Sequence, residues 1–248
     1  MKTFTIGKKK IVLKEEWMVG FITTWIVGLL AHAYRFFNFL PIWDSIYNFT
    51  GVGSTYTLGR WFLGYAGLIT SMFDLPWVNG AFSLFYISIV VILLTEMFEI
   101  KNKGMIVLCA AIFVSFPTVV SSFAYMYTAD AYLLAFLLAT LAVYLTWCVK
   151  KWGTIAGMVC LAFAMGIYQA YATVAIVLVL LYIIRQFVIE KLDFLEAVRK
   201  DLKYLGMLVG GAVLYAVILK ITLIRYNITL PGYQGIGALG IMSLGQYK

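Results

Sequence analysis

Length, composition and charge place most of this chain in lipid. It has 248 residues, of which 63% are hydrophobic and only 12% charged, and its mean hydropathy is +0.94. A water-soluble domain of this length has too little interior to bury so much apolar surface. The formal net charge of +8 does not indicate nucleic-acid binding, because the cations lie at the ends of apolar runs and not in a basic stripe among aromatic residues.

Apolar runs of about 20 residues predict a bundle of transmembrane helices, because a helix needs that length to cross roughly 30 Å of hydrocarbon. The runs lack the strict alternation of a β-barrel. The predicted fold is all-α, one polytopic transmembrane domain over residues 1–248 with about seven spans, at 17–37, 78–98, 104–123, 128–149, two within 152–189, and 204–226. The run at 152–189 would be nearly two bilayers long as one helix, so we expect it to turn back at Gly166–Tyr171.

The connecting segments are predicted to differ in character. Residues 38–79 form a long first outer loop, in which 58–73 carry few polar groups and are predicted to lie flat as an interfacial helix. Residues 190–203 are predicted to form an amphipathic helix on the inner surface, and 227–248 to form an outer tail.

Charge asymmetry predicts the orientation. Most of the 19 lysines and arginines fall on the side of the N-terminus, which the positive-inside rule places in the cytoplasm. The cations left outside are Arg35, Arg60, Lys220, Arg225 and Lys248. The same assignment leaves three outer carboxylates: Asp44, Asp74 and Asp130.

Asp44 and Asp130 are the outer acids with a functional interpretation. Asp44 follows the first span, where partial desolvation would suit it to accept a hydroxyl proton. The alternative is an ordinary loop residue or a helix cap. Asp130 lies at the outer mouth of the fourth span, where ionisable groups are costly and often functional, although the helix dipole also favours an acid there. Asp74, before Leu75-Pro76, is predicted to cap a helix.

Arg60 is the main basic candidate. On an interfacial helix it could bind a lipid phosphate through two hydrogen bonds, or it could contact headgroups non-specifically. Arg35 is a weaker candidate, because snorkelling explains a cation at the end of a span. Trp43 and Trp61 could stack on sugar rings or belong to the aromatic belt at the membrane surface. The belt is favoured for Trp61, whereas Trp43 adjoins Asp44.

Residue spacing predicts no metal or cofactor site. Cys109, Cys148 and Cys160 are irregularly spaced and have no histidine beside them. His32, the single histidine, lies within the first span and is predicted to bond to a neighbouring helix. The turn at 51–53 lacks the context of a nucleotide-binding loop.

Three motifs give the chain a resemblance to a known family. They are Gly59-Arg60-Trp61, the stretch Tyr127–Tyr132 within FPTVVSSFAYMYTADAY, and Gly166–Tyr171, which is GIYQAY. With Trp43-Asp44 before them, their order over residues 30–175 resembles the bacterial glucosyltransferases of the Gtr type II group, which convert O-antigen serotype.

The resemblance implies a GT-C-like glycosyltransferase in the bacterial plasma membrane. Such an enzyme would move a sugar, glucose by the resemblance, from a polyprenyl-phosphate carrier to a surface glycan on the outer face. The implied roles are acid/base catalysis for Asp44 and Asp130, donor-phosphate binding for Arg60 and Arg35, and sugar or acceptor binding for Trp43, Trp61, Tyr127 and Gln169. Members of the family are usually longer, so this chain is expected to be the N-terminal part of a longer architecture or a divergent form.

The acids of the first loop depart from the pattern of many GT-C enzymes. Many GT-C enzymes carry paired acids in the first loop, whereas Asp44 stands between Trp43 and Ser45, so no metal ligand is assigned and a divalent cation has no support in the sequence.

Two other functions stay open. One is a transporter or a flippase of lipid-linked sugar, which mid-membrane polar groups and inverted repeats would favour. The other is a non-catalytic membrane partner, which the odd number of spans would favour.

Overall fold

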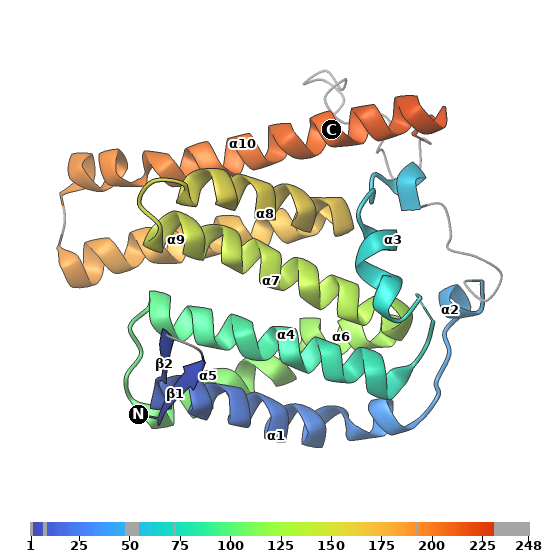
Figure 1. Ribbon diagram of the computed structural model, residues 1–248, viewed down its shortest axis with the longest axis horizontal. Helices are drawn as coiled ribbons and strands as arrows, with labels where there is room; N and C mark the ends of the chain where they lie inside the picture. The colour runs from blue at the N-terminus through green and yellow to red at the C-terminus, as the bar shows by residue number, and fades with distance from the viewer. Residues whose placement is uncertain (1, 7–8, 48–54, 72, 192, 231–248) are drawn as a thin grey trace, which may run out of the picture.

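The computed structural model describes residues 2–6, 9–47, 55–71, 73–191 and 193–230, and these form a helical bundle (Figure 1). The long helices lie side by side along the long axis: α1 (Glu15–Phe37), α4 (Pro76–Met97), α5 (Lys103–Ser115), α7 (Met126–Cys148), α8 (Gly153–Ile167), α9 (Ala172–Arg185) and α10 (Phe194–Tyr226). Shorter pieces connect them: α2 (Trp43–Tyr47), η2 (Thr55–Leu58), α3 (Leu63–Ala66), η3 (Gly67–Ile69), α6 (Pro117–Ser122), η4 (Phe123–Tyr125), η5 (Gln169–Tyr171) and a π-helical turn, η6 (Gln186–Glu190).

Five helical stretches are long and apolar enough to cross a membrane: Glu15–Phe37, Pro76–Met97, Lys103–Cys148, Gln169–Glu190 and Arg199–Tyr226. The third stretch has 46 residues and folds back on itself, because Phe113 of α5 stacks on Phe136 of α7 with ring centroids 5.3 Å apart. Helix α8 is apolar but has only 15 residues, which is fewer than the roughly 20 that a full crossing needs. The count of seven spans therefore stays a prediction.

Helix α7 forms the centre of the bundle, between α4 and α8. Its Ala129 and Leu133 pack with Leu84 and Ile87 of α4 in one buried cluster. A second row of its alanines packs with the end of α8 in another cluster that contains Ala131, Ala135, Ala139, Ala164 and Ile167. Small side chains at this spacing allow close approach of helix backbones. The start of α7 is thereby held in the middle of one end of the bundle.

The local structure differs from the prediction in two places, and part of the prediction lies outside the described residues. A two-stranded antiparallel hairpin, β1 (Lys2–Ile6) with β2 (Lys9–Leu13), precedes α1 and was not predicted. The predicted boundary at 203 falls inside the continuous 33-residue helix α10, because no glycine or proline interrupts residues 194–205. The predicted outer tail lies mostly outside the described residues, as do residues 48–54 of the outer loop and the side chains of Leu192 and Val198.

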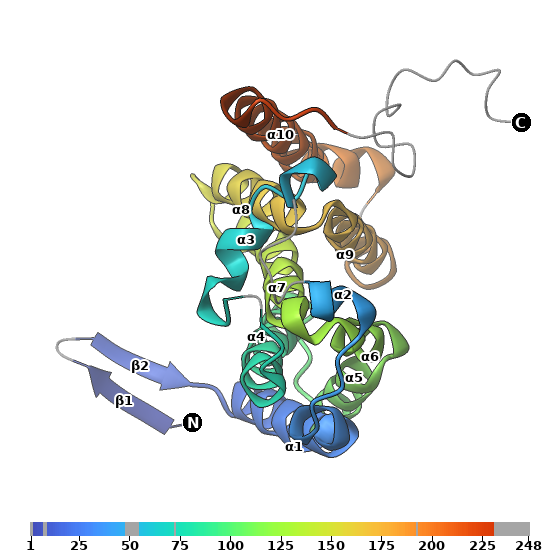
Figure 2. The same cartoon turned by 90° about the vertical axis from the view of Figure 1, so that its right-hand side faces the viewer.

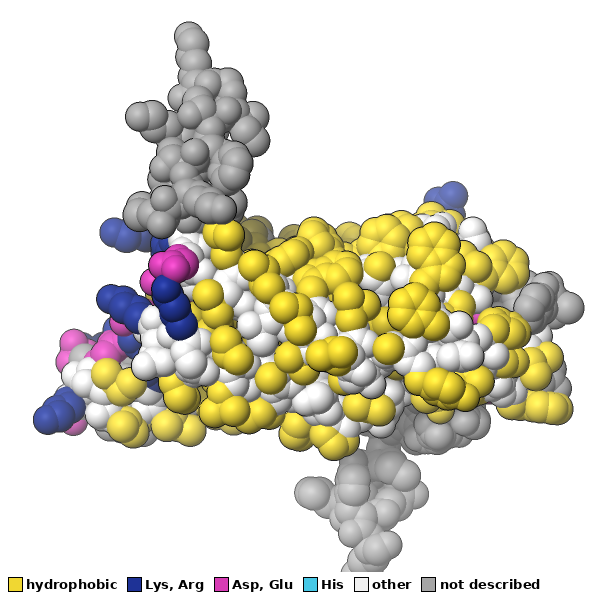
Figure 3. Space-filling model, turned by 90° about the horizontal axis from the view of Figure 1, so that it is seen from below, with side chains coloured by type: hydrophobic (Ala, Val, Ile, Leu, Met, Phe, Trp, Pro, Cys, Tyr) yellow, Lys and Arg dark blue, Asp and Glu magenta, His cyan; other side chains and the backbone are white. Residues whose placement is uncertain are grey.

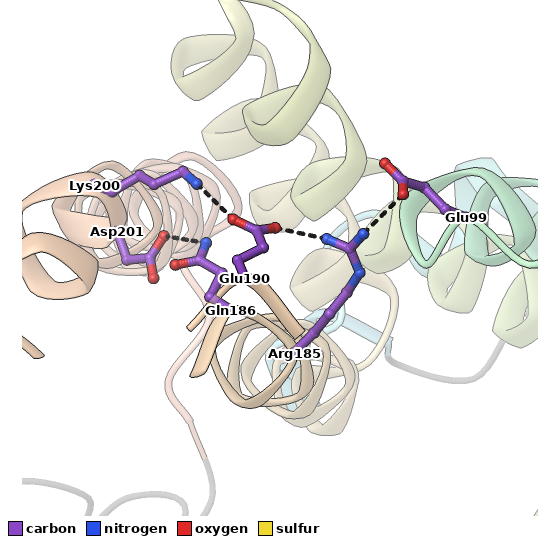
Figure 4. Close-up of polar contacts among 6 residues, drawn as sticks. All are labelled: Glu99, Arg185, Gln186, Glu190, Lys200 and Asp201. Carbon is purple, nitrogen blue, oxygen red and sulfur yellow. Dashed lines mark hydrogen bonds and ion pairs between the residues drawn. The ribbon is translucent and has the colours of Figure 1, made fainter. Parts of the chain in front are cut away.

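Charged side chains gather at one end of the bundle, and apolar side chains cover much of the rest of the face in view (Figure 3). At the charged end, Arg185 bridges two acids, with 3.0 Å to Glu99 and 2.8 Å to Glu190 (Figure 4). Lys200 of α10 lies 3.0 Å from the other oxygen of Glu190. This chain of alternating charges joins the end of α4 to α9 and α10. A charged end of this kind is what the positive-inside rule predicts for the cytoplasmic side.

Candidate active site

The three motifs of the sequence meet at the other end of the bundle. Seen end-on, α2, α3 and α6 lie around the start of α7 (Figure 2). The segment from Thr55 to Ile69 forms three short helical pieces, and not the single interfacial helix that was predicted over 58–73. Its backbone breaks at Gly59, which has a φ of +72°, a conformation that glycine adopts without the steric cost of a side chain.

Arg60 follows this break and is held by aromatic side chains. Its Nη1 donates to the hydroxyl of Tyr132 at 3.1 Å, and its guanidinium carbon lies 4.4 Å from the ring centroid of Tyr168. Its Nε is buried and has no hydrogen-bond partner among the described residues. Within that part of the chain Arg60 forms no ion pair. Arg60 is therefore a half-buried cation whose Nε has no hydrogen-bond partner among the described residues and is covered by protein atoms.

Side chains from two distant segments fix the turn before Arg60. Gln169 of η5 donates through Nε2 to the carbonyl of Leu58 at 2.8 Å and to the hydroxyl of Tyr215 at 2.9 Å. The Tyr215 hydroxyl in turn donates to the carbonyl of Gly59 at 3.0 Å. A Cβ at Gly59 would lie 2.6 Å from Gln169 Nε2 and 2.8 Å from Tyr215 Oη, so the approach requires glycine there.

Trp61 anchors the same segment from its other side. It is only 7% exposed, and its ring packs edge-on against Phe163 of α8 with centroids 5.2 Å apart. The backbone N–H of Phe62 donates to the carbonyl of Gly166 at 2.8 Å. A Cβ at Gly166 would come within 2.6 Å of the Trp61 ring. This burial favours a packing role for Trp61, and its assignment to sugar binding stays a prediction.

Asp130 lies at the start of α7 and is 2% exposed. Its Oδ1 accepts from Asn79 Nδ2 at 3.1 Å and its Oδ2 accepts from Thr70 Oγ1 at 3.2 Å. Asn79 also accepts from the backbone N–H of Leu75 at 2.9 Å. Both carboxylate oxygens therefore bind neutral donors of the outer loop and of α4, and this tie fixes the loop to the central helix.

Asp44 and Trp43 lie on α2 with exposed side chains. Asp74 is not the cap that was predicted, because α4 starts after Leu75 without any side-chain cap. Both carboxylate oxygens of Asp74 are buried and have no hydrogen bond of ordinary geometry to a described residue. Burial raises the pKa of Asp74, an effect that the nearby Ser45 hydroxyl and Arg35 guanidinium oppose in part.

Arg35, at the end of α1, is engaged by the backbone. Its Nε donates to the carbonyl of Phe123 at 2.8 Å, its Nη2 to that of Ala124 at 3.2 Å, and its Nη1 to that of Leu40. All three of its nitrogens therefore bind carbonyls that join α1, the outer loop and η4. The donors left to bind a phosphate are fewer than those of Arg60.

A family model described as glucosyl transferase GtrII matches residues 33–248. The match covers the three motifs and every helix that holds them. The chain belongs to the GtrII glucosyl transferase family. No curated protein and no solved structure matched the chain. Family membership confirms the resemblance found in the sequence, and together with the apolar helices it makes the chain a membrane glycosyltransferase.

The GtrII match extends the family relationship beyond residue 175, to η6 and α10. This extension matters for the site, because Tyr215 of α10 contacts the turn before Arg60. Tyr127, assigned to sugar or acceptor binding, is half-buried beside the cluster of α3, α7 and α8. Among the described residues no three histidine, cysteine or acidic side chains form a group that could hold a metal ion.

Sequence reasoning missed five residues of this GtrII site. Tyr132 and Tyr168 lie within the quoted motifs but were not singled out, although two tyrosines flanking an arginine are a recognisable arrangement. Thr70 and Asn79 carried no signal in the sequence, because their role arises only from their hydrogen bonds to Asp130 in the folded protein. Tyr215 carried a weak signal, since a hydroxyl inside an apolar span needs a partner. A cavity of about 260 Å³ lies elsewhere, at the charged end, lined by Lys14, Thr95 and Glu96 among others.

Proposed function

We propose that this GtrII member transfers glucose from a polyprenyl-phosphate carrier to a hydroxyl of a surface glycan, on the outer face of the bacterial plasma membrane. The observation that supports this most is that Arg60 is half-buried and forms no ion pair with a described residue. A half-buried cation without a carboxylate partner is costly, and an anionic ligand would offset that cost. The phosphate of a lipid-linked sugar is such an anion, and it is held at membrane depth by its own lipid chain.

The geometry of Arg60 suits a phosphate. Tyr132 occupies Nη1 and Tyr168 covers one face of the guanidinium. In the proposed complex the side chains that cover Nε move aside, and the edge formed by Nε and Nη2 donates two parallel hydrogen bonds to two phosphate oxygens. Such a contact would also stabilise the negative charge that grows on the phosphate as it leaves the sugar.

We assign the acceptor's proton to Asp44. The carboxylate oxygens of Asp74 are buried, and those of Asp130 are bound to Asn79 and Thr70, so Asp44 is the outer acid that a glycan hydroxyl can reach. In the proposed step the acceptor oxygen forms a bond to the anomeric carbon, and the bond from that carbon to the phosphate oxygen breaks. The electron pair leaves with the phosphate, and the hydroxyl proton passes to Asp44.

The remaining predicted residues take supporting roles in this proposal. Trp43, exposed beside Asp44, is the aromatic surface for a sugar ring, and Tyr127 stays a candidate acceptor contact. Asp130 acts by holding the outer loop to α7, and Arg35 by joining α1 to η4. Trp61 and Gln169 shape the turn that carries Arg60.

The test is transfer by the purified chain in liposomes. Radiolabelled polyprenyl-phosphate glucose or UDP-glucose is supplied with surface glycan as acceptor. We expect label in the glycan from the lipid donor alone, with a loss of about 100-fold or more for Asp44→Asn, the range for a general base. Transfer from UDP-glucose but not from the lipid donor would overturn the donor assignment. Undiminished transfer by Asp44→Asn would overturn the role of Asp44.

A further inference from the structure

The geometry points to Tyr215 of α10 as a positioning residue for Arg60, acting through the turn at Leu58–Gly59 together with Gln169. This inference rests on the proposed phosphate-binding role of Arg60. It adds α10, the last helix among the described residues, to the site, although none of the three motifs lies in that helix.

The contacts form a closed set. The Tyr215 hydroxyl accepts from Gln169 Nε2 at 2.9 Å and donates to the Gly59 carbonyl at 3.0 Å, and the same Gln169 nitrogen donates to the Leu58 carbonyl at 2.8 Å. Two successive carbonyls are thus held directly before Arg60. Because Gly59 sits at a φ of +72°, glycine's freedom would otherwise let the turn relax into other conformations.

A positioning role explains why a hydroxyl lies here in an apolar helix. Neighbouring residues of α10, such as Val213 and Val217, are exposed on the bundle surface, where lipid would surround them. A phenylalanine at 215 would fill the same volume, so packing alone does not require the hydroxyl. What the hydroxyl adds is a fixed place for the backbone that carries Arg60. A displacement of about 1 Å in a site of this kind can cost about 100-fold in rate.

The test is a double-mutant cycle on the whole protein in liposomes, with polyprenyl-phosphate glucose as donor. We expect Tyr215→Phe to lower kcat/KM for the donor by about tenfold or more, which is about 1.4 kcal/mol. In an Arg60→Ala background the same change should have less than a twofold effect, because the group that Tyr215 positions is gone. Tyr204→Phe is the control, since it removes a buried hydroxyl from the same helix at the charged end. It should leave transfer unchanged.

A second readout does not depend on transfer. Phenylglyoxal modifies accessible arginines, and mass spectrometry can follow its reaction at Arg60. We expect a several-fold change in that rate for Tyr215→Phe and for Gln169→Met, and none for Tyr204→Phe. Gln169→Met tests the same contacts if Tyr215→Phe does not fold.

The outcomes separate the two claims. Wild-type kinetics and an unchanged modification rate for Tyr215→Phe would overturn the positioning role, as would equal losses in the wild-type and Arg60→Ala backgrounds. Failure of wild-type protein to transfer glucose, or full transfer by Arg60→Ala, would instead count against the proposed function. In that case the modification rate still decides whether Tyr215 holds Arg60 in place.

Discussion

Arg60 is held as a cation by groups that do not neutralise it. Tyr132 accepts one hydrogen bond and Tyr168 offers the face of its ring, and both contacts orient the guanidinium without neutralising its charge. If the proposed phosphate donor binds here, it meets a guanidinium that Tyr132 and Tyr168 already orient. The residue was predicted from sequence. Its tyrosine neighbours were not, because their pairing with Arg60 depends on the fold of α7 and α8.

The burial of the Asp74 carboxyl predicts that the thermal stability of the protein depends on pH. Its pKa is raised by burial, with Ser45 and Arg35 opposing, so the folded protein keeps a proton that the unfolded chain releases above about pH 3.9. The stability from the neutral form is therefore present below that pH and lost as the pH rises through the folded pKa. We expect Asp74→Asn to unfold at a temperature higher than wild type by about 2 °C or more at pH 7.5, and to lose this advantage near pH 4.

Thermal unfolding in detergent, followed by tryptophan fluorescence across this pH range, measures the effect of Asp74→Asn. Ser71→Ala, in the same loop but without a titratable group, is the control and should show no such pH dependence. A difference between wild type and Asp74→Asn that does not change with pH would contradict the stated environment of Asp74.

At the scale of elements, glycines set how closely α8 and the Arg60 segment approach. Gly166→Ala would place a methyl group 2.6 Å from the buried Trp61 ring, and overpacking of this kind costs about 1–3 kcal/mol. We expect a lower unfolding temperature and reduced transfer. Gly206→Ala in α10 meets nothing within 4 Å and should be neutral or slightly stabilising, since alanine is the better helix former.

Both alanine variants can be compared by thermal unfolding and glucose transfer under one set of conditions. An unfolding temperature of Gly166→Ala equal to that of Gly206→Ala would show that Trp61 moves aside without cost. That result would contradict the tight fit between α8 and the turn.

Sequence reasoning predicted the long helices better than the pieces between them. The turn between α8 and α9 falls at Gly166–Tyr171 as expected, because the bilayer limits the length of an apolar helix. The interfacial helix was wrong as a single element: the backbone breaks at Gly59, which has a φ of +72°, and α3 ends before Gly67. The break expected before 204 was also wrong, because composition changed there without any helix-breaking residue. Hydropathy reports the solvent of a segment, and not whether its backbone is continuous.

At the scale of the whole molecule, transfer on the outer face requires that the end with Arg60 and Asp44 faces out. In a background with Cys109, Cys148 and Cys160 replaced by serine, we expect Ile46→Cys on α2 to react with a membrane-impermeant maleimide in spheroplasts. Lys151→Cys, in the exposed turn before α8, should react only after lysis. The reverse pattern would place Arg60 and Asp44 in the cytoplasm and would contradict transfer on the outer face.

The central claim is that Arg60 binds the phosphate of a lipid-linked sugar, and equilibrium binding tests it most directly. Wild-type protein, Arg60→Ala and the control Arg225→Ala, which changes an exposed arginine at the end of α10, are placed in nanodiscs with polyprenyl-phosphate glucose and analysed by native mass spectrometry. We predict that Arg60→Ala raises the Kd about tenfold or more, since hydrogen bonds to charged groups contribute about 1.5–3 kcal/mol, while Arg225→Ala binds as wild type does. Equal affinity of wild type and Arg60→Ala for the donor would contradict the account.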